Sequence, residues 1–119
     1  MAWCTQEDLT LYVLQAYLSV AEEKSPGVTN RAVDAVHGEI DEALLAGGYA
    51  ASGASATLCR IAAALSAWRT VAAVTTLVTS EADTDNEWLP LLHERNRAES
   101  DLTAIREGKL DPFPKAQSS

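Results

Sequence analysis

The chain has 119 residues, and its 9 Lys and Arg against 17 Asp and Glu give a formal net charge of −8. This length suits one domain with one core, and an acidic chain without clustered Lys and Arg is not typical of proteins that grip a nucleic-acid backbone. Ala is abundant and alternating β-branched runs are hard to find. We therefore expect an all-α protein, a compact bundle of about four helices with a long central helix and an extended C-terminal tail.

The two cysteines, Cys4 and Cys59, lie far apart and in no metal-like spacing. We expect free buried thiols and no disulfide framework, since the count is low and the first eight residues lack the basic start and apolar core of a secretion signal.

The first predicted helix begins at Thr5, which is followed three residues later by Asp8 in the pattern of a capping box. We expect one continuous helix that ends at Glu22, Glu23 and Lys24. Its apolar residues form two stripes: Leu9, Val13, Ala16, Tyr17 and Val20, and then Leu11, Leu14 and Leu18. A helix that is apolar on two faces needs two neighbours, either within the chain or in another copy of it.

The second predicted helix follows the turn at 25–28, is capped by Thr29 or Asn30, and runs to about Ala46. Its apolar face has helical spacing and consists of Val33, Val36, Ile40 and Leu44. Gly47 and Gly48 then supply a residue that is free to adopt positive φ at the helix end.

The third predicted helix runs from Ser55 or Ala56 to about 79–80, and we expect Trp68 at the centre of the core. The apolar stretch 54–78 is interrupted by Arg60 and Arg69. An arginine near a bilayer centre is costly, so a buried central helix is a better interpretation than a membrane span.

An acidic connection at 81–87 leads to the fourth predicted helix, with Pro90 tolerated in its first turn and Gly108 at its end. We expect a helical domain over 1–108 and an extended or flexible tail over 109–119. Phe113, between two prolines, indicates either a disordered end or a docking tail for a partner.

No catalytic constellation stands out. His37 and His93 lie on separate predicted helices without HExxH spacing, and we interpret His37 as structural. Glu39, Asp41 and Glu42 could bind a cation, but they project in different directions from a helix, so a solvated acidic face is the preferred interpretation. We expect no enzyme activity, no metal and no cofactor.

The order of these features resembles the Mu-like family of small phage proteins assigned as head-tail connector, adaptor or neck proteins. The resemblance begins at Thr5-Gln6-Glu7-Asp8-Leu9 and is clearest over 33–49. The matching residues there are Glu39-Ile40-Asp41, Leu44 and Gly48-Tyr49, followed by Leu58, Ala62, Leu65 and Trp68 and then by Leu102, Ile105, Gly108 and Leu110. The chain departs from the family around its turn, where Gly48 stands in place of Arg and Ala50-Ala51-Ser52 in place of Pro, and in the acidic segment 81–87.

The resemblance implies a structural virion protein that forms a homo-oligomeric ring, commonly of twelve copies, below the portal protein and above a downstream neck, stopper or tail protein. Phage DNA would only pass through its channel, and no membrane would be involved. The protein would occur in the host cytoplasm during assembly and then in the virion neck. As contacts with a neighbouring subunit or the portal we expect Asp41, Glu42, Tyr49, Leu110 and Phe113.

Two other interpretations stay open. One is a small acidic helical protein with an interaction or regulatory role, for instance a decoy for a DNA-binding partner. The other is an enzyme subunit whose site is completed by a second chain.

Overall fold

Four α-helices and one 3₁₀-helix make up the regular structure of the part of the chain described here. A computed structural model describes residues 2–50, 53, 55–74 and 89–113. The elements are η1 (Gln6–Leu11), α1 (Gln15–Lys24), α2 (Val28–Gly47), α3 (Ala56–Val74) and α5 (Leu89–Arg106). The described residues contain no strand, so the prediction of an all-α bundle is confirmed.

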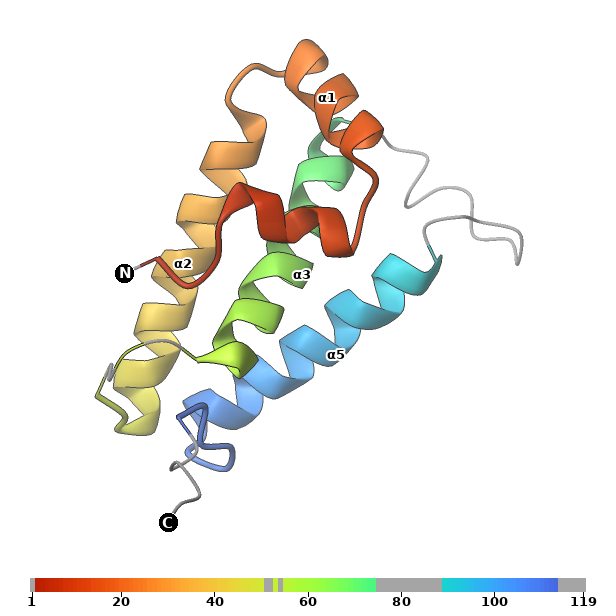
Figure 1. Ribbon diagram of the computed structural model, residues 1–119. Coiled ribbons are helices and arrows are strands. Elements are labelled where there is room, and N and C mark those ends of the chain that lie inside the picture. Colours follow the sequence, from red (N-terminus) through yellow and green to blue (C-terminus); the bar gives the residue numbers. More distant parts are fainter. Residues whose placement is uncertain (1, 51–52, 54, 75–88, 114–119) are drawn as a thin grey trace.

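Helix α3 lies at the centre of the bundle and contacts α2, α5, α1 and η1 (Figure 1). Its sequence explains this position, because apolar and small residues occur all around the helix and 61–68 are buried without interruption. The predicted long central helix is thus confirmed. None of the helices in the described ranges is long and apolar enough to cross a membrane.

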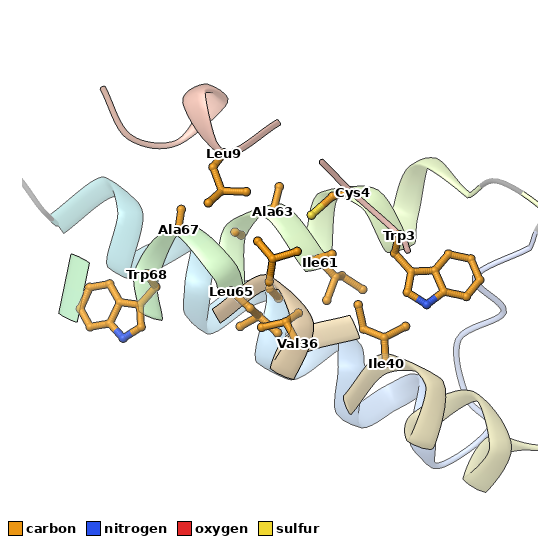
Figure 2. Packing of buried hydrophobic residues seen from close by; sticks show 14 of the residues in the cluster. Trp3, Cys4, Leu9, Val36, Ile40, Ile61, Ala63, Leu65, Ala67 and Trp68 are labelled. Atoms are coloured by element: carbon orange, nitrogen blue, oxygen red, sulfur yellow. The ribbon is translucent and has the colours of Figure 1, made fainter. Parts of the chain in front are cut away.

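The core forms where α2, α3, α5 and η1 meet. The side chains with essentially no exposure include Leu9, Val36, Ile40, Leu58, Ile61, Leu65 and Ile105. Trp68 is also buried, but it lies at one end of the packed cluster, away from Ile61 and Leu65 (Figure 2). The guanidinium carbon of Arg95 lies 5.2 Å from the centroid of the Trp68 ring. The prediction that Trp68 marks the centre of the core is therefore wrong, because smaller side chains permit the closest helix packing.

The predicted first helix is broken into two pieces. The Thr5 N–H donates to Asp8 Oδ2 over 2.9 Å, as the capping pattern predicts, but η1 ends at Leu11 and α1 begins only at Gln15. Leu14 has extended backbone angles, with φ −63° and ψ 143°. The break lets the two halves turn different faces inward, so that Leu9 and Leu18 are both buried.

The start of α2 is capped differently from the prediction. Neither Thr29 nor Asn30 occupies the cap position, which belongs to Gly27 in the left-handed region, with φ 83°. A carboxylate from α1 replaces the local cap, because Glu22 accepts hydrogen bonds from the N–H groups of Gly27 and Thr29 over 2.9 and 3.0 Å. These bonds satisfy amide donors that have no partner within the helix.

The remaining predicted boundaries follow local signals. Ser55 Oγ accepts the Leu58 N–H over 3.1 Å at the start of α3, Gly48 ends α2 with φ 83°, and Gly108 follows α5 with φ 76°. The predicted end of the third helix at 79–80 and the acidic connection 81–87 lie outside the described residues.

Candidate functional site

The residues expected to contact a neighbour lie near the C-terminal ends of α2 and α5. Gly47 and Ile105 bring these two helix ends together so closely that a Cβ atom added at Gly47 would lie 2.1 Å from the Ile105 carbonyl oxygen. The half-buried residues Tyr49, Leu110 and Phe113 all pack against the core. The described part of the predicted tail is thus packed against the bundle, and residues 114–119 lie outside the description.

Asp41 and Glu42 are adjacent in sequence but differ in environment. Asp41 is half-buried and its Oδ1 accepts the indole N–H of Trp3 over 2.8 Å. Glu42 is exposed, and its Oε1 lies 3.8 Å from Arg106 Nη2. Of this pair, Glu42 is the better placed to meet another molecule, while Asp41 holds the N-terminal segment.

Trp3 is a residue that the sequence interpretation missed. It is 5% exposed, and its ring centroid lies 5.9 Å from that of Phe113 at an interplanar angle of 52°. Trp3, Asp41 and Phe113 are thereby brought together from three distant parts of the chain. The signal in the sequence was a large aromatic residue ahead of the first helix, but the neighbouring residues do not indicate which part of the fold it packs against.

His37, one helical turn before Asp41 on α2, anchors the same N-terminal segment. Its Nε2 accepts the backbone N–H of Trp3 over 3.3 Å and that of Cys4 over 3.2 Å. Only a neutral imidazole can accept these bonds, and burial lowers the pKa of His37 accordingly. A structural role of His37 follows directly from these contacts.

Cys4 lies beside this imidazole but is a poor candidate for a nucleophile. Its Sγ is 3.6 Å from His37 Nε2, an arrangement that resembles a Cys-His pair. Burial, however, raises the pKa of the Cys4 thiol to about 12, so the thiol stays protonated at neutral pH and the reactive thiolate is not formed. Cys4 is free and buried as predicted, and Cys59 is free and half-buried.

The acidic face of α2 is only partly solvated. Glu39 accepts two hydrogen bonds from Arg69 of α3, at 2.5 and 2.8 Å, and this hydrogen bonding lowers the pKa of Glu39. Across the bundle, Arg60 of α3 pairs with Asp101 of α5 at 2.6 Å. Among the described residues, no group of three His, Cys, Asp or Glu side chains could hold a metal ion.

An open groove separates the end of η1 from the first half of α5. It has a volume of about 420 Å³ and is lined by Leu11, Tyr12, Arg60, Pro90, Leu91, Glu94 and Arg97. We call this feature the η1–α5 groove. Leu11 at its edge is 76% exposed, and Leu14, three residues further along, is 66% exposed. These leucines belong to the second predicted stripe, of which only Leu18 is buried within the described part of the chain.

A second exposed leucine site lies on α2. Leu45 is 80% exposed, and Glu42, one helical turn earlier, shares its exposed face. Gly38 extends this face by about one further turn, and a Cβ atom added there would meet nothing within 4 Å. We call the face formed by Gly38, Glu42 and Leu45 the Leu45 face.

Comparison with known proteins finds no match: no family model, no curated protein and no solved structure is similar to this chain.

Proposed function

We propose that this chain is a structural virion protein, a head-tail connector or adaptor that forms a ring below the portal protein. In this role it would bind further copies of itself, the portal protein on one side, and a neck, stopper or tail protein on the other. It would reside in the virion neck after assembly in the host cytoplasm.

The observation that carries the proposal is the exposure of large apolar side chains at separate places on a small acidic helical bundle. Leu11 lines the η1–α5 groove and Leu14 follows it in the chain, whereas Leu45 lies near the far end of α2. Isolated exposed leucines are common, but a ring subunit needs at least two contact surfaces, one for each neighbour. The resemblance over Glu39 to Tyr49 adds the expectation of a connector.

The charge of the chain also suits a channel through which DNA only passes. A net charge of −8 disfavours tight binding to phosphates, and acidic walls would let DNA slide. Binding of DNA in solution is therefore not expected, even though DNA would traverse the assembled ring.

The test is recovery of an affinity-tagged chain from host cells in which virions assemble, followed by identification of the co-purified proteins. Recovery of portal or neck proteins supports the proposal, as does density for this chain in electron micrographs of the assembled neck. Recovery of a repressor or nuclease would favour the alternative, an acidic interaction or regulatory protein. A neck without density for this chain would refute the connector role.

A further inference from the structure

We propose that the Leu45 face of one copy docks into the η1–α5 groove of the next copy, in a head-to-tail contact. This inference deepens the proposed function, because it specifies how neighbouring subunits would meet. The two surfaces are widely separated on the bundle: the C-terminal end of α2 lies at one end, and the groove lies between η1 and the N-terminal half of α5 (Figure 1).

The shapes of the two surfaces fit such a contact. The Leu45 face presents a protruding, 80% exposed leucine on a helix whose outer surface is open at Gly38. The groove is lined by apolar and charged side chains together, and Leu11 gives it an exposed apolar rim. Burial of Leu45 and Leu11 together would remove two large apolar side chains from water.

The charges of the two surfaces are complementary. Asp34 and Glu42 are the exposed acids on this side of α2, and Arg106 of α5 lies 3.8 Å from Glu42. The groove instead holds two arginines against one acid, although one of the arginines, Arg60, is already paired with Asp101. Arg97 is the more available of these, since its side chain is 62% exposed and its Nη1 meets Glu94 only at 4.0 Å.

A head-to-tail contact of this kind has a consequence for the type of assembly. It pairs Glu42 of one copy with Arg97 of the next, and contacts between two different surfaces generate rings or filaments.

Engineered disulfides test the contact in the purified protein, because they capture weak association. In a Cys59→Ser background, Leu45→Cys protein is mixed with Leu11→Cys protein, with oxidised glutathione as the oxidant. The matched control replaces Leu11→Cys by Val20→Cys, which changes a 45% exposed residue of α1 outside the groove. We expect more dimer with Leu11→Cys than with Val20→Cys, and a ladder of larger species when Leu45→Cys and Leu11→Cys are combined in one chain.

Exchange of the charges on Arg97 and Glu42 provides a second test of the contact. Arg97→Glu, added to the Leu11→Cys protein, should lower the yield of its disulfide dimer with the Leu45→Cys protein by up to about fivefold, the equivalent of one ion pair at the rim of an interface. Glu42→Arg, added to the Leu45→Cys protein, should restore the yield. Equal yields for Leu11→Cys and Val20→Cys, or no response to charge exchange, would overturn the inference. Recovery of portal or neck proteins from cells is measured separately, so this contact can fail while the proposed function stands.

Discussion

His37 offers the sharpest test of the structure, because one side chain holds the N-terminal segment through two backbone hydrogen bonds. In His37→Ala, the N–H groups of Trp3 and Cys4 lose their acceptor at 3.3 and 3.2 Å. A buried donor left without a partner costs about 1 to 3 kcal/mol, and these bonds are long, so the lower end of that range applies to each. We expect the free energy of unfolding to fall by about 2 kcal/mol, measured by urea denaturation followed by circular dichroism.

The pH dependence follows from the lowered pKa of His37, whose ordinary value is 6.5. Below that pH the imidazole of the unfolded chain binds a proton that the folded chain does not bind. The contribution of His37 to the free energy of unfolding is therefore fully present above pH 6.5 and declines as the pH falls. The slope can reach about 1.4 kcal/mol per pH unit. Measurements between about pH 7.5 and 5.5 avoid the range in which carboxylates titrate.

His37→Gln is the informative variant, because it offers a carbonyl acceptor and does not titrate. We expect it to lose most of the decline between these two pH values, whereas His93→Gln, which changes an exposed residue, should retain it. The same decline in His37→Gln and the wild type would refute the assignment of the imidazole as a neutral acceptor.

Two further predictions concern packing, and both are measured as changes in the urea midpoint. Gly47→Ala should destabilise the fold, because its Cβ atom would lie 2.1 Å from the Ile105 carbonyl oxygen. The Cβ atom of Gly38→Ala would meet open space, so this variant should stabilise α2 by up to about 1 kcal/mol. Equal effects of the two substitutions on stability would contradict the close approach of α2 and α5. Leu65→Ala should lower the free energy of unfolding by about 2 to 5 kcal/mol, because the side chain is fully buried. Leu11→Ala should change it by no more than about 0.5 kcal/mol. A large loss of stability in Leu11→Ala would show that this leucine is covered in the folded protein.

Some features of this protein follow from the sequence alone. Helical spacing of apolar residues predicted the bundle and its central α3, and short-range signals marked several boundaries, among them Thr5 with Asp8, Ser55, and the glycines at 48 and 108. These signals act within one or two helical turns. They are readable because the residues that form each cap or apolar face are neighbours in the chain.

The candidate site was predicted less completely. Asp41, Glu42, Tyr49, Leu110 and Phe113 were chosen from a resemblance and from the acidity of α2, and nothing local separated the engaged Asp41 from the exposed Glu42. Their different environments depend on the long-range partners Trp3 and Arg106.

Only the tertiary structure decided which side chain meets which. Contacts between separate elements determine four features: the break after Leu11, the cap that Glu22 supplies to α2, the hydrogen bonds of His37 to the backbone of Trp3 and Cys4, and the position of Trp68 at one end of the core. Periodicity shows that a face is apolar, but packing decides whether that face is covered. Leu9 and Leu11 make the point: both are apolar residues of one short helix, yet Leu9 is fully buried and Leu11 is 76% exposed, because α3 covers only one side of η1.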